Sequence, residues 1–313
     1  MTTLRLATFN VENLFARWRF KDGVDPAEAN TRGWIVDQTR FKELGMDDKA
    51  ITGAAVRELD ADVLALQEVE NVDTLKHFRD RSLGGAAKYP YVAGVDGNDV
   101  RLIDVAVLSK LPITHIRTYQ HLVDPASPTA PLFSRDCLEV DVLVGANGGP
   151  GRTVTLFVNH FKSMREGRSQ TRSKRERQSA GVMDIVTRRF GQSPGEHPFV
   201  VLGDLNDYLQ TNGNGSSGID GLVGWDQVEN VVARLPEEEQ WTHFFAGGNE
   251  YRQLDYLLPS ASLAAAVPTA TPEIFRKGMP LRAVRYKGPR FMGVGFDRPK
   301  ASDHCPVVFE LEV

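Results

Sequence analysis

Short apolar segments rich in Val, Leu, Ile and Phe recur along the whole chain, and Gly, Pro, Asp or Asn bounds them. Segments of this length and composition are typical of buried β-strands. The predicted strands are Leu4 to Phe9, Val63 to Gln67, Tyr91 to Val95, Ile103 to Leu108, Cys137 to Val144, Val154 to Asn159, Phe199 to Gly203, Gln253 to Leu258 and Val307 to Val313. A chain with so many short strands folds around sheets rather than as a helix bundle.

Clear helical spacing of apolar residues is confined to two segments, Asp47 to Leu59 and Gln170 to Phe190. Residues 16–45 show no clean period, and we expect an ordered excursion or lid there. Residues 277–299 are basic and interrupted by prolines, which predicts a loop. Many strands with few helices therefore predict two packed mixed sheets flanked by helices, in one domain over residues 1–313.

The composition excludes several protein classes. The 313 residues carry a net charge of −4, which argues against nonspecific coating of nucleic acid but is compatible with a local basic patch. Cys137 and Cys305 are too few for a disulfide framework and lack metal-knuckle spacing. The chain shows no signal peptide and no apolar stretch long enough to span a bilayer. We expect a cytoplasmic monomer without stable membrane association, secreted only if a leader has been removed.

Polar side chains cluster where several predicted strands begin or end. The clusters are Thr8-Phe9-Asn10, Leu66-Gln67-Glu68-Val69, Leu202-Gly203-Asp204-Leu205-Asn206 and Ser302-Asp303-His304. Polar residues at strand ends are what a rigid scaffold uses to direct chemistry at one point in space. Carboxylates, amides and imidazoles in such a setting suit metal-assisted attack on a phosphate ester.

Six short motifs occur in the order that the endonuclease/exonuclease/phosphatase superfamily shows, and the chain resembles that superfamily nearly end to end. The motifs are Thr8-Phe9-Asn10, Leu66-Gln67-Glu68-Val69, Val158-Asn159-His160, Gly203-Asp204-Leu205-Asn206, Gln253-Leu254-Asp255-Tyr256 and Ser302-Asp303-His304. Each motif alone is a weak signal, but six in order are together strong. The resemblance implies a DNase I-like, four-layer α/β/β/α sandwich with the site at one end of the two sheets. It also implies a divalent-metal phosphoesterase activity.

The resemblance implies a cation site, and the residue types agree with it. Glu68 is expected to bind Mg²⁺ directly, Asn10 to supply an amide oxygen directly or through water, and Asp303 a further carboxylate at the same or a second metal position. Magnesium takes oxygen ligands and keeps several waters, so this set suffices. Mn²⁺ or Ca²⁺ is the alternative cofactor. In isolation, Asn10 would be read as a turn former and Glu68 as a surface acid.

Asp204 and Asn206 lie two residues apart, so they face the same way if the strand geometry persists. The resemblance assigns the attacking water to Asp204 and a phosphate oxygen to Asn206. It also pairs Asp255 with His304, and a neighbouring carboxylate raises the pKa of an imidazole and fixes its tautomer. A charge inside the apolar strand around Asp255 would be costly unless it were paired.

His160 is the second histidine of the implied site and is expected to donate to the scissile phosphate. Its acidic partner stays open, with Asp104 a candidate by placement alone. A dense run of basic residues follows His160 and leads into the second predicted helix. The basic residues expected to bind substrate phosphates are Arg101, Arg135, Lys162 and Arg172.

These expectations combine into a divalent-metal-dependent endonuclease or exonuclease that hydrolyses nucleic-acid phosphodiester bonds by in-line attack of water. Residues 101–106, 134–136 and 160–163 resemble the bacterial nuclease-like branch of the superfamily. Two alternatives stay open. One is a phosphatase or phosphodiesterase acting on a small phosphorylated substrate, such as an inositol phosphate or a phospholipid head group. The other is a non-catalytic binding module of the same fold.

Overall fold

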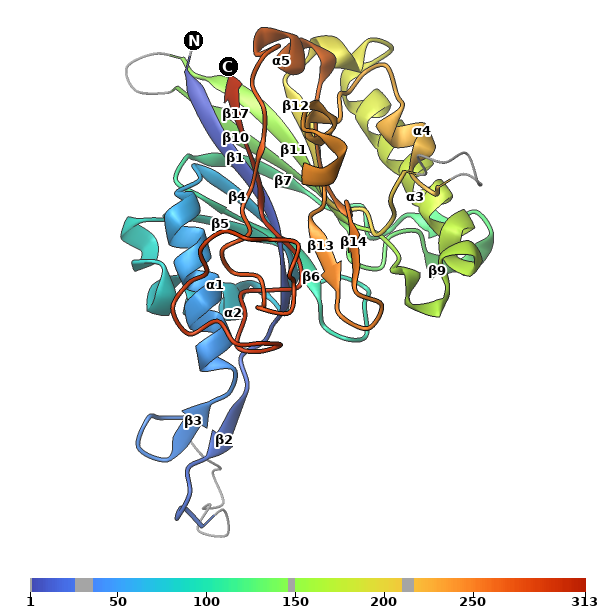
Figure 1. Ribbon diagram of the computed structural model, residues 1–313. Helices are drawn as coiled ribbons and strands as arrows, with labels where there is room; N and C mark the ends of the chain where they lie inside the picture. The colour runs from blue at the N-terminus through green and yellow to red at the C-terminus, as the bar shows by residue number, and fades with distance from the viewer. Residues whose placement is uncertain (1, 26–35, 146–149, 210–216) are drawn as a thin grey trace.

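The computed structural model describes residues 2–25, 36–145, 150–209 and 217–313. Two sheets pack face to face at the centre of the molecule, and helices cover the outer face of each (Figure 1). The first sheet has the strand order β16-β17-β1-β4-β6-β5, and the second has the order β15-β12-β11-β10-β7. The prediction of a four-layer α/β/β/α sandwich of two mixed sheets is confirmed.

Both sheets combine parallel and antiparallel pairs, since β1 is parallel to β4 and antiparallel to β17, and β11 is parallel to β12 and antiparallel to β10. The first sheet contains β1 Thr3–Leu14, β4 Val63–Val69, β5 Tyr91–Gly94, β6 Asp104–Ser109, β16 Glu273–Ile274 and β17 Val307–Glu312. The second contains β7 Ile113–Arg117, β10 Cys137–Val144, β11 Arg152–His160, β12 Phe199–Asp204 and β15 Asp255–Pro259. Small two-stranded sheets add β2 Trp18–Phe20 with β3 Phe41–Glu43, β8 Val123–Asp124 with β9 Ser127–Pro131, and β13 His243–Phe245 with β14 Glu250–Arg252.

Helices α1 and α2 cover the first sheet, and α3 and α4 lie on the side of the second (Figure 1). The α-helices are α1 Met46–Leu59, α2 Val72–Ser82, α3 Arg168–Phe190, α4 Asp220–Val223 and α5 Ala261–Ala266. Short 3₁₀ turns are η2 Gly85–Ala87, η3 Met164–Glu166, η4 Pro194–Glu196, η5 Val231–Arg234 and η6 Glu237–Glu239. Helix α2 was not predicted, because its sequence is largely polar; its amino end is capped by Asn71, which accepts a hydrogen bond from the Thr74 amide at 2.8 Å.

Strand β4 shows why the central strands are apolar throughout. Val63 and Ala65 pack in the core between the two sheets, whereas Leu64 and Leu66 pack in the core formed with α1 and α2. Successive side chains of a strand point to opposite faces, and both faces of this strand are covered. An unbroken apolar run is therefore required here, and polar residues appear only where the strand reaches the edge of the layers.

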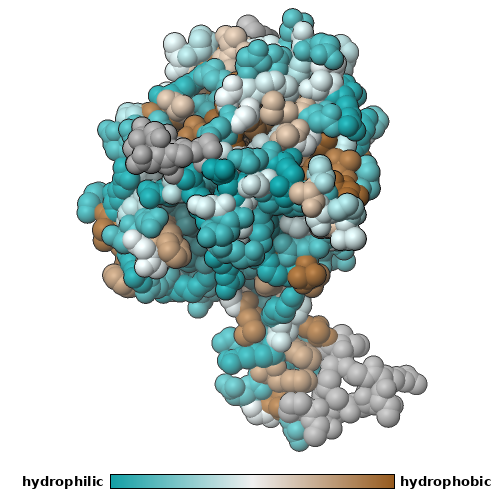
Figure 2. Space-filling view, turned by 90° about the vertical axis from the view of Figure 1, so that its right-hand side faces the viewer, coloured by the Kyte–Doolittle hydropathy of each residue, from teal (hydrophilic) through white to brown (hydrophobic). Residues whose placement is uncertain are grey.

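The two segments without clear periodicity differ in structure. Residues 16–45 include the hairpin of β2 and β3, which projects from the body (Figures 1 and 2). The rest of that prediction, residues 26–35, lies outside the described residues. Residues 277–299 contain no helix or strand, as predicted. No helix among the described residues is both long and apolar enough to cross a membrane.

The topology brings predicted site residues to one end of the sandwich. Parallel strands β1 and β4 run in one direction in the first sheet, as do β11 and β12 in the second. Asn10 near the carboxyl end of β1 donates a hydrogen bond to Asp204, the last residue of β12, at 3.0 Å. The carboxyl ends of these strands from both sheets therefore meet at one place.

Candidate active site

Asp204 lies at the centre of this meeting point and is almost fully buried. Its Oδ2 accepts hydrogen bonds from the side-chain amides of Asn10 at 3.0 Å and Asn206 at 3.1 Å. Its Oδ1 accepts from the Asn206 backbone amide at 2.8 Å. Asn206 has a left-handed φ of 52°, so a turn rather than a continued strand brings the two side chains together. Burial raises the pKa of Asp204 to about 7, and nearby Asp255 adds to this effect while His304 opposes it.

Two histidines lie close to the carboxylate of Asp204. Nε2 of His160 is 3.4 Å from Asp204 Oδ2, and Nε2 of His304 is 3.8 Å from the same oxygen. Nδ1 of His304 is 2.8 Å from Oδ2 of the fully buried Asp255, which also accepts a 2.7 Å hydrogen bond from the Thr242 hydroxyl. The structure therefore brings the predicted pair of Asp255 and His304 into direct contact.

The surroundings give the two imidazoles opposite charge states. Burial alone would lower the pKa of His304, but Asp255 and Asp204 outweigh it and raise the pKa well above the ordinary value. Burial lowers the pKa of His160 well below the ordinary value, and the positive charge of Arg135 adds to this. These shifts favour the charged form of His304 and the neutral form of His160.

Asp104 is not the acidic partner of His160. Buried Nδ1 of His160 has no hydrogen-bond partner among the described residues. The Asp104 carboxylate instead accepts a hydrogen bond from the Gly97 amide at 2.8 Å, and burial raises its pKa to about 6. The candidate pairing from placement alone was wrong, because Asp104 lies at the start of β6 and is used to close the loop that precedes it.

Glu68 reaches the cluster through a local distortion of β4. The residue has a left-handed φ of 65°, and the pairing of β4 with β6 shifts register between Gln67 and Val69. Such a bulge re-aims one side chain without ending the strand. Oε1 of Glu68 is 3.4 Å from Nδ2 of Asn10 and 3.9 Å from Nε2 of His160.

The chemistry of these groups fits a hard divalent cation. Glu68 offers a partly exposed carboxylate beside the amide of Asn10. The Asn10 amide nitrogen faces the carboxylates, while its oxygen accepts from the Glu12 amide at 3.0 Å. A half turn of the amide exchanges these atoms and presents the oxygen. Carboxylate and amide oxygens are the ligands that Mg²⁺, Mn²⁺ and Ca²⁺ take.

Asp303, the other predicted metal ligand, is partly exposed. Ser302 beside it donates a 2.7 Å hydrogen bond to the Asn10 carbonyl. Oδ2 of Asp303 is 4.0 Å from Nε2 of His243, and these two residues with His304 form a group whose potential ligand atoms lie within 4.8 Å of one another. His243 was missed from the sequence, because it sits in a three-residue strand, β13, that is too short to show periodicity.

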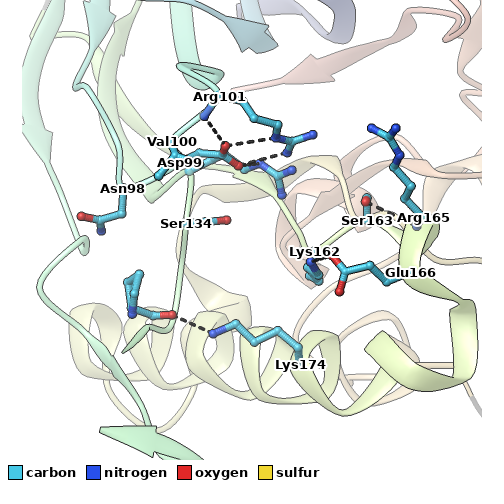
Figure 3. A pocket seen from close by; sticks show the side chains of 12 residues that line it. Asn98, Asp99, Val100, Arg101, Ser134, Lys162, Ser163, Arg165, Glu166 and Lys174 are labelled. Atoms are coloured by element: carbon cyan, nitrogen blue, oxygen red, sulfur yellow. Dashed lines mark hydrogen bonds and ion pairs between the residues drawn. The ribbon is translucent and has the colours of Figure 1, made fainter. Parts of the chain in front are cut away.

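A pocket of about 770 Å³, shown in Figure 3, opens next to the cluster of side chains around Asp204. It is lined by Asn98, Asp99, Val100, Arg101, Pro131, Ser134, Arg135, Lys162, Ser163, Arg165, Glu166 and Lys174. Three of the four predicted substrate-binding residues, Arg101, Arg135 and Lys162, are therefore in one cavity. Arg172 is not among its lining residues. Its Nε lies 3.1 Å from Glu176 one turn further along α3.

The model of the Endonuclease/Exonuclease/phosphatase family matches residues 7–304, and the chain belongs to this family. Members of the family are hydrolases that act on phosphate esters, and they usually use divalent metals. No curated protein matches the chain.

Solved structures with the same fold cover nearly the whole chain. Truncated TDP2 from Caenorhabditis elegans is 19% identical with a TM-score of 0.59, over 99% of this chain and 98% of that one. The human Nocturnin catalytic domain with bound sulfate is 14% identical with a TM-score of 0.61, over 99% and 94%. A mannosyl-6-phosphatase from Bacteroides thetaiotaomicron is 15% identical with a TM-score of 0.60, over 99% and 100%. At these identities the likeness concerns the fold alone.

Proposed function

We propose that the protein is a divalent-metal-dependent phosphodiesterase, most specifically a nuclease that hydrolyses nucleic-acid phosphodiester bonds by in-line attack of water. The observation that carries the proposal is the set of contacts around Asp204. Two amides, a neutral imidazole and an imidazolium lie on one buried carboxylate at 3.0 to 3.8 Å. A base, hydrogen-bond donors and a cation site within one cluster are what phosphoester cleavage requires.

In this mechanism Asp204 takes a proton from the attacking water. A pKa of about 7 makes its carboxylate a competent base near neutral pH, since the best general bases have a pKa close to the working pH. The backbone and side-chain amides of Asn206 fix the orientation of its oxygens. The imidazolium of His304 donates a proton or a hydrogen bond to a phosphate oxygen. Asp255 keeps this imidazolium charged and oriented.

Asn206 would donate to a non-bridging phosphate oxygen by giving up one of its two side-chain hydrogen bonds, to Asp204 or to the Phe161 carbonyl, and His160 would donate to another. Glu68 and Asn10 would hold the cation, with Asp303 as a further ligand at the same or a second position. Mg²⁺ is the ion we favour, with Mn²⁺ or Ca²⁺ as alternatives. When bound, the ion supplies positive charge that stabilises the negative charge gained by the phosphate oxygens. The monomeric state of the protein and its location in the cytoplasm stay predictions from the sequence.

The second candidate function is hydrolysis of a small phosphorylated substrate, such as a sugar or inositol phosphate. The structural likeness to a mannosyl-6-phosphatase favours it, because the same fold serves a small substrate in that protein. A non-catalytic binding module is less well supported. Every predicted catalytic residue lies within the contact network of Asp204, and a module that had lost catalysis would not need this network.

Turnover of two chromogenic esters tests the proposal. The purified protein is incubated with bis-p-nitrophenyl phosphate or with p-nitrophenyl phosphate, with Mg²⁺ or with EDTA. We expect Mg²⁺-dependent cleavage of the diester. Turnover of the monoester alone would support the phosphatase instead. Turnover of neither ester with Mg²⁺, Mn²⁺ or Ca²⁺ would contradict both enzymatic functions and leave the binding module.

A further inference from the structure

We propose that the pocket beside the catalytic cluster binds a second phosphate group of the substrate, so that the preferred substrates carry at least two phosphates. The inference rests on the proposed function and makes its substrate class more specific. It follows from three features of the pocket: its link to the catalytic residues, its buried arginine, and the arrangement of its other charges.

The pocket and the catalytic cluster share one backbone atom. The Phe161 carbonyl accepts a hydrogen bond from Asn206 Nδ2 at 3.2 Å and another from Arg135 Nη1 at 2.8 Å. Asn206 also contacts Asp204, whereas Arg135 lines the pocket. A phosphate in the pocket would lie beside the phosphate held by Asn206 but apart from it, because Asp204, Asn206 and the two histidines are not among the lining residues of the pocket.

Arg135 is a charged group that the protein buries at some cost. Its side chain is 3% exposed, and its one ion-pair partner among the described residues is Asp99, whose Oδ2 lies 3.0 Å from Nε. Asp99 is shared, because both of its oxygens also accept hydrogen bonds from Arg101. Burial lowers the pKa of Arg135 and the positive charge of Arg101 adds to this effect, whereas Asp99 opposes it. An anionic group in the pocket would complete the compensation.

The remaining charges surround the cavity. Its lining residues include five basic side chains and two acidic ones. Arg101 and Lys174 lie on opposite sides with Lys162 and Glu166 between them, as Figure 3 shows. Lys174 is held by Asp124 and by the Pro131 carbonyl, both at 2.7 Å. The Arg165 side chain, in contrast, has no hydrogen-bond or ion-pair partner among the described residues, so its guanidinium is available to a ligand.

These features fit a phosphate rather than an apolar group. Arginine forks bind phosphate oxygens in pairs, and side chains held in place lose little entropy on binding. The volume of about 770 Å³ accommodates a phosphate together with the sugar or ring that carries it. Two sources have this chemistry: the next phosphate along a nucleic-acid strand, and the second phosphate of a small bisphosphate. The test therefore includes both.

Matched chromogenic substrates isolate the contribution of the second phosphate. Thymidine 5′-(p-nitrophenyl phosphate) is compared with its 3′-phosphorylated form, and thymidine 3′-(p-nitrophenyl phosphate) with its 5′-phosphorylated form. A further arm compares inositol 1-phosphate with inositol 1,4-bisphosphate by phosphate release. We expect the second phosphate to raise kcat/KM about tenfold in at least one pair, as one charge-assisted contact would. The pair that responds identifies the source.

Arg165→Gln should remove most of this gain and leave kcat/KM for the one-phosphate ester unchanged. Arg188→Gln is the matched control, because Arg188 is an exposed arginine of α3 paired with Asp184, and it should keep the full gain. Turnover of the one-phosphate esters with no gain in any pair, or a gain that survives Arg165→Gln, overturns the inference and leaves the proposed function intact.

If no ester is turned over, the proposed function fails and binding decides the inference. Calorimetry then compares thymidine 3′,5′-bisphosphate with thymidine 5′-phosphate on the wild type and on Arg165→Gln. Binding of the bisphosphate that is about tenfold tighter and depends on Arg165 supports the pocket as a phosphate site. Equal affinity for the two nucleotides contradicts it.

Discussion

Asn10 donates a 3.0 Å hydrogen bond to Asp204, and this single contact joins the ends of two different sheets across 194 residues of sequence. Asn10 belongs to the first sheet and Asp204 to the second. The packing of the sheets therefore sets the geometry of the site directly. Side chains that are held by two rigid layers need little rearrangement to act on a substrate, which is the arrangement that electrostatic catalysis favours.

Asp204→Asn should reduce kcat for bis-p-nitrophenyl phosphate by about 10²- to 10⁴-fold, the range over which a general base contributes. Asn has nearly the same volume, so the far-UV circular dichroism spectrum and the unfolding midpoint should stay close to those of the wild type. Asp226→Asn, at an exposed position, is the control and should keep full activity. Near wild-type turnover by Asp204→Asn would mean that another group is the base.

Asp255 should act mainly through His304, because its Oδ2 contacts Nδ1 of that residue at 2.8 Å. We expect His304→Ala to lower kcat by about 10²-fold or more, and Asp255→Asn to lower it less. The double variant should lose no more than His304→Ala does, since the second change removes a partner that is already gone. Steady-state kinetics of the four proteins measure this. Losses that simply multiply would show independent roles.

The raised pKa of Asp104 predicts that the free energy of unfolding depends on pH. Its ordinary pKa of 3.8 is raised by burial to about 6 in the folded protein. Between these values the folded protein binds more protons than the unfolded chain, so the free energy of unfolding falls as the pH rises through this window. Asp104→Asn should remove that slope and raise the free energy of unfolding at pH 7 by on the order of 3 kcal/mol.

Urea unfolding at pH 4 to 8 measures this effect. Asn can keep the hydrogen bond from the Gly97 amide, so only the charge changes. Asp73→Asn, at a side chain that is 96% exposed, is the control and should leave the slope unchanged. An Asp104→Asn protein that is less stable than the wild type at pH 7 would show that the charged form is favoured in the folded state.

Among the charged side chains near the pocket, Arg175 should contribute most to the free energy of unfolding. It is fully buried in α3, contacts Asp207 at 2.8 Å and donates to the Lys162 and Arg168 carbonyls. Arg175→Met leaves the buried Asp207 with one fewer partner, and it should lower the free energy of unfolding by about 3 kcal/mol. Arg188→Gln, on the surface of the same helix, should change it by less than about 0.5 kcal/mol. Equal effects in urea unfolding would contradict the assignment.

The sheet strands were predicted well where local sequence decides their ends. The bounds of β10 agree with the prediction, because Asp136 and Gly145 on either side have left-handed φ values of 70° and 74° that cannot continue a strand. The motifs at strand ends could also be assigned, since parallel strands deliver their carboxyl ends to one edge. This part of the fold follows from local composition and the period of two.

Other parts of the site depend on tertiary contacts that local sequence does not encode. The left-handed bulge at Glu68 aims its carboxylate, yet nothing in Leu66-Gln67-Glu68-Val69 distinguishes it from a regular strand. Asp99 was missed because its partner Arg135 comes from a distant loop. The basic run after His160 did not reveal which residues face the pocket: Lys162 lines it, whereas Arg172 pairs with Glu176 along α3.

The most direct test of the central claim is a metal titration of diester turnover by the wild type and by Glu68→Gln. The account predicts that EDTA abolishes cleavage of bis-p-nitrophenyl phosphate and that Mg²⁺ restores it. Glu68→Gln should need at least about tenfold more Mg²⁺ for half-maximal activity, because it loses a charged oxygen ligand beside Asn10. Turnover that persists in EDTA, or a Glu68→Gln protein with the Mg²⁺ requirement of the wild type, would contradict it.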